Sequence, residues 1–328
     1  MTLGRIFLVL AVSASLLGCG NSAEIGDHVS TPAAPAKSAG PKKIALVLKT
    51  LTNPFFIEME RGARRAEKEF GIELEVKTGS DETAIEQQIQ IVDDLIQSHV
   101  DAIVIAPGDS ERLVPILKKA QAAGIVIINI DNQLDRSVVA SQHMTPLPFV
   151  STDNQEGGYR AAKFLAARAR KPTQAAIIEG LRSAANAQMR LAGAGRAFAE
   201  NANIRVVASE SAEWKIDQAH EVARQVFEAH PQVRLVFCAN DMMALGVIKY
   251  LQDSRRKDVM VSGYDALDEA RAAIKSGAMA VTIDQQAAEQ GYQGVALAVR
   301  ALEGASVPAM LTVDSRVVTA ANGEQAAN

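Results

Sequence analysis

From Lys43 onward the chain alternates short apolar runs with amphipathic stretches. Most of the runs are continuously apolar, which is typical of parallel strands covered on both faces. The stretches between them carry apolar residues three or four positions apart, as at Ile85, Ile89 and Val92, and this spacing predicts helices. The predicted strands are Ile44–Leu48, Leu74–Lys77, Ala102–Ala106, Val126–Ile130, Ala175–Ile178, Arg205–Ala208, Leu235–Ala239, Met260–Gly263 and Ala280–Ile283.

The repeated alternation of strand and helix predicts an α/β fold with doubly wound parallel sheets. About nine or ten such units are more than one open sheet holds comfortably, so we expect two sheets in two lobes. The segment Ser141–Thr152 contains two prolines and has no periodicity, which marks the break between the lobes. Ligands of parallel sheets bind at the carboxyl ends of the strands, and two lobes that face each other at those ends enclose a cleft.

The N-terminal residues have the pattern of a targeting segment. Arg5 is followed by the apolar run Ile6–Leu17, which is too short to span a bilayer and suits a signal sequence. The run ends in small and aliphatic residues directly before Cys19, an order that resembles the bacterial lipobox. We predict a signal peptide at 1–18, followed by lipidated Cys19 and a flexible linker at 19–42. The alternative is a buried N-terminal element with an incidental cysteine.

These features predict a protein of the periplasm or cell surface that is held to a membrane through its lipid only, with the inner or outer membrane left open. The net charge is −4 and no block of Lys and Arg appears, which argues against binding of nucleic acid. Neither the two cysteines nor the five histidines have the spacing of a metal site, and we expect no metal and no cofactor.

Carboxylates and carboxamides follow one predicted strand after another. Each is by itself more often a helix cap or a turn residue, but together these groups match the vicinal hydroxyls of a sugar or polyol. No Ser-His-Asp order, nucleophile elbow or glycine-rich phosphate loop accompanies them, so the set favours binding over catalysis. These residues are Asp131, Asn132, Asn240, Asp265 and Gln285.

Aromatic residues can supply the apolar side of such a site. Asn53 before Pro54 fits a helix N-cap with proline at the first helical position. Phe55 and Phe56 follow directly, and both cannot point into one core. With Trp214 they can pack against the C–H face of a sugar.

Several motifs of the folded part occur together in one known family. They are Asn53-Pro54-Phe55-Phe56, Asn129-Ile130-Asp131, Asn240-Asp241-Met242-Met243-Ala244-Leu245-Gly246 and Gly263-Tyr264-Asp265. In this combination, from about Lys43 to Val318, the chain resembles the ribose-type periplasmic sugar-binding proteins, the type I solute-binding proteins of ABC importers, in a lipoprotein form. The resemblance implies two Rossmann-like lobes joined by a three-strand hinge. It implies a first lobe of 43–150 plus 286–313 and a second of 151–285 plus 314–322, with a tail at 323–328.

The resemblance also implies ligand contacts from Asn53, Phe55, Phe56, Asp131, Asn240, Asp265 and Gln285, with Trp214 stacked on the sugar ring. Ribose receptors have an asparagine where Ala106 lies and arginines where Asn132 and Gln188 lie, and these departures argue against ribose as the ligand. Asn186, Gln188 and Arg190 are candidate replacement contacts. Lys49 is expected to contact the ligand, to pair with a carboxylate of the cleft, or to line its rim, and it leaves an acidic sugar open.

We therefore expect a monomeric receptor, not an enzyme, that binds a sugar or polyol and delivers it to an ABC permease. The same fold also serves as a sensor for a membrane receptor or a histidine kinase. A repressor's effector domain requires an N-terminal helix-turn-helix, and the sequence has a signal peptide there. An enzyme that uses Asp131 and Asp265 as acid and base is the remaining alternative.

Overall fold

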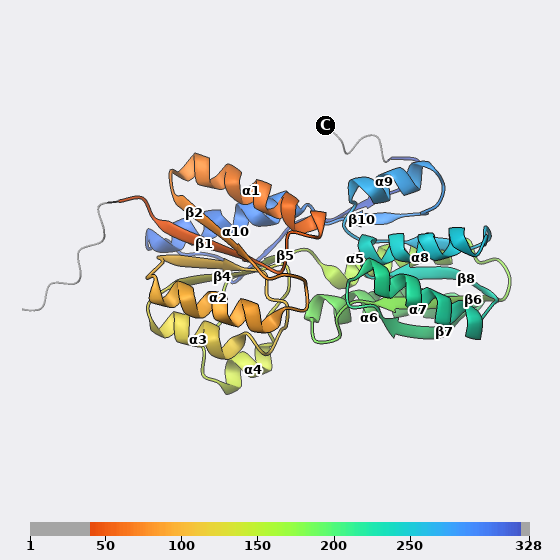
Figure 1. Ribbon diagram of the computed structural model, residues 1–328, viewed down its shortest axis with the longest axis horizontal. Coiled ribbons are helices and arrows are strands. Elements are labelled where there is room, and N and C mark those ends of the chain that lie inside the picture. Colours follow the sequence, from red (N-terminus) through yellow and green to blue (C-terminus); the bar gives the residue numbers. More distant parts are fainter. Residues whose placement is uncertain (1–39, 323–328) are drawn as a thin grey trace, which may run out of the picture. The chain divides into compact units, whose positions relative to one another are not determined.

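The computed structural model describes residues 40–322, and two lobes lie side by side within this range (Figure 1). The first lobe consists of β1 (Lys43–Leu48), α1 (Pro54–Phe70), β2 (Glu73–Thr78), α2 (Ile85–Gln97), β3 (Ala102–Ile105), α3 (Val114–Ala122), β4 (Val126–Ile130), α4 (Arg136–Ser141), β5 (Phe149–Ser151), α10 (Ala287–Leu302) and β11 (Met310–Thr312). The second consists of α5 (Asn154–Ala166), β6 (Thr173–Glu179), α6 (Ala185–Ala199), β7 (Ile204–Ser211), α7 (Ile216–Ala229), β8 (Val233–Cys238), α8 (Asp241–Asp253), β9 (Met260–Ser262), α9 (Asp268–Lys275), β10 (Thr282–Asp284) and β12 (Arg316–Val318).

The first lobe is built on a parallel sheet with strand order β11-β5-β4-β3-β1-β2. Strand β1 is apolar at every position after Lys43 because both of its faces are covered. Ile44, Leu46 and Leu48 belong to one apolar core and Ala45 and Val47 to another, as the alternation of side chains along a strand requires. Helices α1 and α10 pack on the first face and α2 and α3 on the second (Figure 1).

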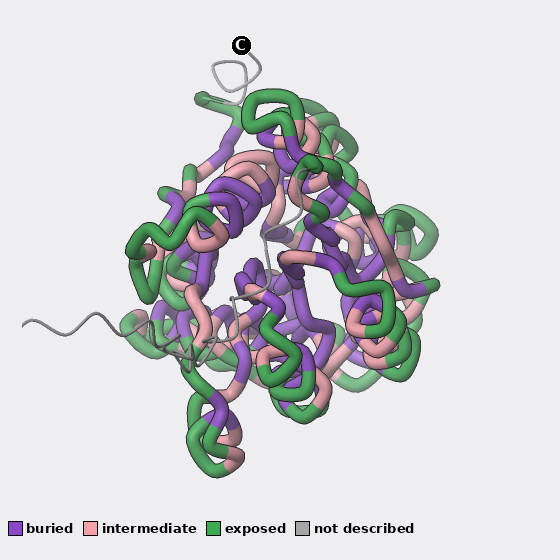
Figure 2. The backbone as a smooth tube through the Cα atoms, turned by 90° about the vertical axis from the view of Figure 1, so that its left-hand side faces the viewer, coloured by how far each residue is buried: buried purple, intermediate pink, exposed green. Residues whose placement is uncertain are grey.

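The second lobe has a parallel sheet in the order β7-β6-β8-β9. Helices α5 and α6 pack together on one side of it, and α7 and α8 on the other. A parallel bridge between Ser262 and Val281 continues the sheet toward β10, which pairs with β12 in antiparallel fashion. Buried residues lie in the interior of the molecule and exposed residues gather at its outer surface (Figure 2).

The predicted α/β fold with parallel sheets in two lobes is present, and each predicted strand overlaps an observed one. The segment 141–152, predicted as the break between the lobes, contains β5, which pairs with β4 and β11. Within residues 40–322 the chain passes between the lobes after β5, after β10 and after β11. These three passages form the three-strand hinge that the resemblance implies.

The predicted signal peptide at 1–18, Cys19, most of the linker and the tail at 323–328 lie outside the described residues. No helix found between residues 40 and 322 combines the length and the apolar character that crossing a membrane requires.

Candidate functional site

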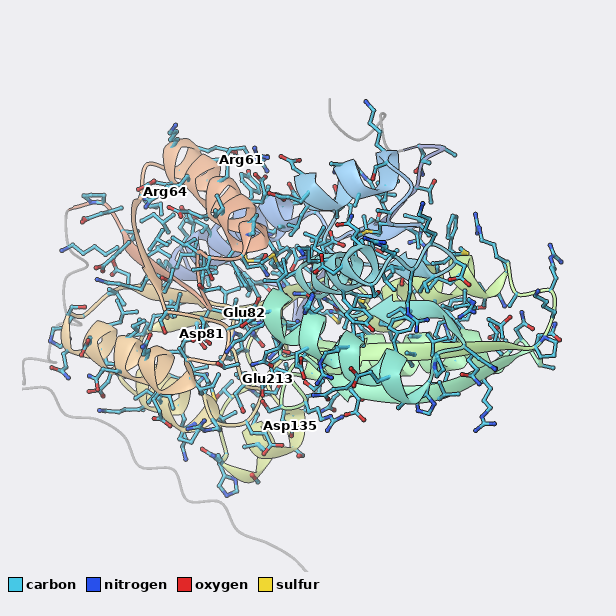
Figure 3. The ribbon with its side chains drawn as sticks, turned by 45° about the vertical axis from the view of Figure 1, so that its right-hand side comes forward. Arg61, Arg64, Asp81, Glu82, Asp135 and Glu213 are labelled. Atoms are coloured by element: carbon cyan, nitrogen blue, oxygen red, sulfur yellow. The ribbon has the colours of Figure 1, made fainter. Side chains whose placement is uncertain are left out.

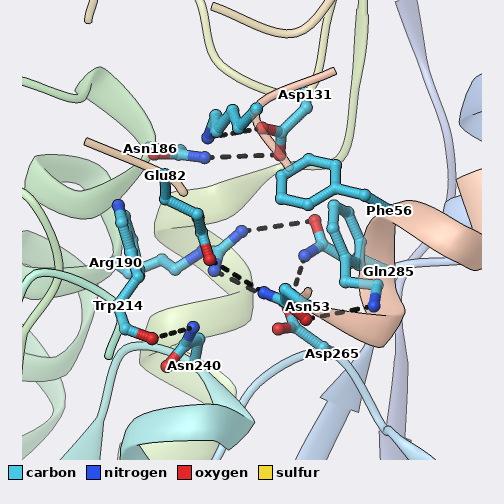
Figure 4. A pocket seen from close by; sticks show the side chains of 12 residues that line it. Asn53, Phe56, Glu82, Asp131, Asn186, Arg190, Trp214, Asn240, Asp265 and Gln285 are labelled. Carbon is cyan, nitrogen blue, oxygen red and sulfur yellow. Dashed lines mark hydrogen bonds and ion pairs between the residues drawn. The ribbon is translucent and has the colours of Figure 1, made fainter. Parts of the chain in front are cut away.

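A small cavity lies where the strands of the two lobes end (Figure 4). The lining residues are Lys49, Asn53, Phe55, Phe56, Glu82, Asp131, Asn186, Arg190, Trp214, Asn240, Asp265 and Gln285.

Each lining residue follows the carboxyl end of a strand. Lys49 comes directly after β1, Asp131 after β4 and Gln285 after β10. Asn240 and Trp214 lie two and three residues beyond the ends of β8 and β7. The parallel strands of each lobe therefore bring distant polar side chains to one edge, as the sequence predicted for this fold.

Three of these residues have a left-handed backbone, which is unfavourable for a side chain other than glycine. The φ angles are 60° at Asp131, 69° at Trp214 and 125° at Asp265. Such conformations cost about 1–3 kcal/mol each and persist where the surroundings fix them. Here backbone bonds do so, from Asp131 N to Val150 O at 3.0 Å and from Asp265 N to Ile283 O at 2.7 Å. Backbone strain of this kind is common at functional sites, and here these backbone conformations direct the three side chains into the cavity.

Lys49 is buried inside the cavity and pairs with a carboxylate. Its Nζ lies 2.8 Å from Asp131 Oδ2, and both side chains are 3% exposed. The ammonium is also 5.6 Å from the centroid of the Phe56 ring and 6.0 Å from that of Trp214. Of the three roles considered for Lys49, the structure places it in an ion pair with a cleft carboxylate and away from the rim.

Arg190 connects several cavity residues from its position on α6. The guanidinium donates from Nε to Asn154 Oδ1 at 2.8 Å and from Nη2 to Gln285 Oε1 at 3.2 Å. Its Nη1 lies 3.9 Å from Asp265 Oδ1, which also accepts a 2.6 Å bond from Gln285 Nε2. Burial raises the pKa of Asp265 well above its usual range, and the nearby Arg190 opposes this shift.

The aromatic residues of the cavity pack closely against neighbouring groups. Phe55 and Phe56 meet edge to face with ring centroids 5.0 Å apart. The Trp214 ring lies against Gly180, where an added Cβ would be 2.1 Å from Cη2, so only glycine leaves room for the indole. Trp214 O accepts a hydrogen bond from Asn240 Nδ2 at 3.3 Å.

Three polar atoms of the cavity are buried without a hydrogen-bond partner among the residues of the described range. Asp131 Oδ2 has the ion pair with Lys49, whereas Trp214 Nε1, which is a donor, and Asn186 Oδ1, which is an acceptor, have no partner of either kind. An unpaired buried polar group costs about 1–3 kcal/mol, and a hydroxyl that donates and accepts can satisfy both kinds of atom. The cavity is therefore suited to a ligand with several hydroxyl groups.

Two predicted contacts do not line the cavity. Gln188 is exposed and donates to Arg182 O at 2.8 Å. Asn132 is fully buried, but it donates to Pro107 O and to Ser110 Oγ, both at 3.1 Å. Its Oδ1 accepts from the backbone of Asn186 at 3.1 Å, so Asn132 links the two lobes beside the cavity.

Further contacts join the lobes around the cavity. Ser110 N donates to Ser183 O at 3.1 Å, and Ala185 N donates to Ser110 Oγ at 2.9 Å. Lys215 Nζ donates to Thr83 Oγ1 at 3.1 Å and lies 3.5 Å from Asp81 Oδ1. The labelled residues Asp81, Glu82 and Glu213 show this meeting of loops at the junction of the lobes (Figure 3). The structure thus has the lobes closed over the cavity.

Glu82 lines the cavity although no sequence motif pointed to it. It lies in the turn between β2 and α2, four residues beyond the end of β2. The same strand-end reasoning that identified the other residues would have included it if the turn after β2 had been considered. Among residues 40–322, no group of three or more His, Cys, Asp or Glu side chains could hold a metal ion.

Comparison with known proteins identifies the family. Residues 44–306 match the family described as periplasmic binding protein domain. The chain belongs to this family. The family and the fold predicted from the sequence are thereby confirmed.

The relatives of this family member are binding proteins for sugars. The D-ribose/D-allose-binding protein of Pseudomonas aeruginosa is 38% identical over 280 residues, which are 84% of this chain and 85% of the relative. The D-allose-binding periplasmic protein of Escherichia coli is 32% identical over 84% of this chain and 91% of its own length. A periplasmic solute-binding protein of an ABC transporter from Actinobacillus succinogenes, solved with bound D-allose, is 36% identical with a TM-score of 0.82. It covers 87% of this chain and 99% of its own.

Proposed function

We propose that this protein is an extracytoplasmic receptor that encloses one neutral monosaccharide between its lobes and delivers it to an ABC importer. The observation that carries the proposal is the closed cavity, in which both lobes present hydrogen-bonding groups and aromatic rings to one common space. Trp214 Nε1 and Asn186 Oδ1 are buried there without partners, and sugar hydroxyls would satisfy both.

The charges of the cavity favour a neutral ligand over a sugar acid. Lys49 and Arg190 supply two positive charges, and Glu82, Asp131 and Asp265 supply three carboxyl groups. The Lys49 ammonium, which had left an acidic sugar open, is already paired with Asp131 at 2.8 Å. A ligand carboxylate would find no unpaired cation and would meet other carboxylates, which destabilises its binding.

We propose D-allose or D-ribose as the ligand, since the relatives that are named as binding proteins for these sugars match most of the chain. The two sugars share the configuration of the hydroxyls at C2, C3 and C4. The sequence argument against ribose rested in part on Gln188, which stands where the resemblance implies an arginine. The structure places Arg190 of the same helix in the cavity, so a guanidinium is present after all. D-ribose therefore remains a candidate ligand together with D-allose.

The cavity also favours binding without turnover. Asp131 and Asp265, the pair considered as acid and base, lie beside Lys49 and Arg190 respectively. A carboxylate paired with an ammonium at close range, as Asp131 is with Lys49, is a poor proton donor. The relatives support the same conclusion, because they too are binding proteins. We propose in addition that Cys19 carries a lipid after removal of residues 1–18, and that the protein acts as a monomer.

Calorimetric titration of the purified protein with D-allose, D-ribose, D-glucose and D-glucuronate tests the ligand. D-glucose differs from D-allose at C3 only, so tight binding of D-allose and D-ribose with weak binding of the other two supports the proposal. Asp265→Asn is expected to weaken binding by about 10- to 100-fold, because an NH₂ group replaces one oxygen of the carboxyl group and can no longer accept a hydrogen bond. Asp258→Asn is the control, because Asp258 is exposed and pairs with Arg234 outside the cavity.

Absence of binding by any neutral sugar would refute the receptor proposal, and altered sugar recovered after incubation would show an enzyme. Labelling of cells with radioactive fatty acid, compared between the natural protein and Cys19→Ser, tests the lipid. Light scattering coupled to size-exclusion chromatography tests the monomer.

A further inference from the structure

Glu82 is the cavity residue with the least evident role. Its side chain projects into the cavity from the turn after β2, in the centre of the group of side chains (Figure 4). One carboxylate oxygen, Oε1, accepts a hydrogen bond from Asn53 Nδ2 at 2.9 Å. Asn53 Oδ1 in turn accepts from Phe55 N at 3.1 Å as the cap of α1, which fixes the amide and with it the position of Glu82.

The two cations of the cavity lie against the other carboxylates. Lys49 pairs with Asp131, and Arg190 approaches Asp265 while bonding to Asn154, Ala239 and Gln285. No ion pair to Glu82 is found within residues 40–322, and the amide of Asn53 is neutral. The cavity therefore has three carboxyl groups for two cations, and Glu82 is the carboxyl group without an ion pair.

We propose that Glu82 is a ligand-contacting residue that binds the sugar as the neutral acid, so that closure of the lobes on the sugar takes up one proton at this carboxyl. The inference rests on the proposed function and names a contact of that same site. In the open protein water solvates the carboxylate. When the lobes close, a proton from solvent binds to the carboxyl group, and the O–H donates a hydrogen bond to a hydroxyl oxygen of the sugar.

The surroundings of Glu82 support this protonation. Burial raises the pKa of Glu82 to about 7, Asp131 adds to the shift, and Lys49, Asn53 and Arg190 oppose it. Asp265 faces the same cavity, and its pKa is also raised by burial. A proton taken up on binding could therefore reside on either carboxyl, and the test has to separate the two.

The sign of the pH dependence follows from the raised pKa. Because the closed form binds the proton more tightly than the open form, sugar affinity is highest at low pH and falls as the pH rises through about 7. For a carboxyl that shifts from its ordinary value to about 7, affinity at pH 5.5 exceeds that at pH 7.5 by about 20-fold. At pH 6.5 the same shift gives uptake of about 0.7 proton per sugar.

Titration calorimetry of D-allose or D-ribose in buffers of different ionisation enthalpy measures this uptake directly. Glu82→Gln mimics the neutral acid, and we expect it to keep the affinity of the natural protein at pH 5.5 within about threefold while losing most of the pH dependence and of the proton uptake. Glu82→Ala removes the contact and is expected to bind more weakly than Glu82→Gln at every pH. Glu86→Gln is the matched control, because its side chain is 75% exposed on α2, and it should behave as the natural protein does.

Each outcome decides the inference. Uptake of a proton that persists unchanged in Glu82→Gln places the proton on Asp265 and overturns the inference, as does binding without any uptake at pH 6.5. Equal binding by Glu82→Ala and the natural protein overturns the contact itself. If no sugar binds to the natural protein, the proposed function fails first, and that result is distinct from binding without proton uptake.

Discussion

Replacing Arg190 by lysine keeps the positive charge but removes the planar group that holds several parts of the second lobe together. The guanidinium donates to Asn154 Oδ1, Ala239 O and Gln285 Oε1, and its carbon lies 3.7 Å from the centroid of the Tyr264 ring. The ammonium group of lysine is not planar and ends a shorter side chain, so it cannot donate hydrogen bonds to these three acceptors at the same time. At least two acceptors would lose their donor in a site where Arg190 is only 2% exposed.

The expected loss follows from the cost of these unpaired acceptors. Each buried acceptor without a partner costs about 1–3 kcal/mol, so two give about 2–6 kcal/mol in the free energy of unfolding. We expect about 3 kcal/mol after local rearrangement, which lowers Tm by roughly 6–12 °C for a domain of this size class. Sugar affinity should fall too, because Gln285 and Asp265 lose the group that orients them.

Thermal and urea unfolding of the sugar-free protein measure this effect. Arg196→Lys is the matched control on the same helix, since Arg196 pairs with Glu156 at 3.2 Å and both side chains are about half exposed. We expect that exchange to change the unfolding free energy by no more than about 0.5 kcal/mol. If Arg190→Lys and Arg196→Lys unfold alike, the network around Arg190 contributes nothing to stability, and the reasoning is wrong.

Two further substitutions test residues that support the cavity from outside its lining. Gly180→Ala places a methyl group 2.1 Å from Trp214 Cη2, so the indole must move, and we expect sugar affinity to fall by about 10-fold or more, measured through the fluorescence of the chain's single tryptophan. Gly195→Ala, which meets no atom within 4 Å, should leave affinity unchanged and stabilise its helix by up to about 1 kcal/mol. Lys215→Ala removes the half-exposed contact with Asp81 between the lobes, and we expect affinity to fall by about two- to fivefold, less at high salt. The measurement is made at two ionic strengths. If Lys215→Ala leaves the sugar affinity unchanged at both, the contact between Lys215 and Asp81 does not support closure of the lobes.

Strand ends were the part of the site that the sequence could predict. The carboxyl ends of parallel strands meet at one edge, so Asp131, Asn240 and Asp265 could be grouped without knowing any distance. Glu82 was not predicted because it lies in a turn. In a turn, neither the period of a strand nor that of a helix determines which way a side chain points.

The choice between the residues of α6 required the phase of the helix. Asn186 and Arg190 are four residues apart and share one face, whereas Gln188 is two residues from each and points away. The sequence named all three because the start of the helix at Ala185 was not fixed in advance. The strands β5 and β11 were not predicted for a related reason. Each has three residues, which is too short a run to show a period, and each is defined by its pairing with a neighbouring strand.

The division of the first lobe between two distant parts of the chain sets an order of assembly as the chain emerges from the membrane. Helix α10 packs on β3, β4 and β5, and β11 pairs with β5, yet both elements follow the second lobe in the sequence. The second lobe therefore emerges in the interval between β5 and α10. During that interval the apolar side chains of Ile128 and Ile130 have no helix to cover them. The second lobe can complete most of its sheet first, and the sugar site forms only when almost the whole chain has been made.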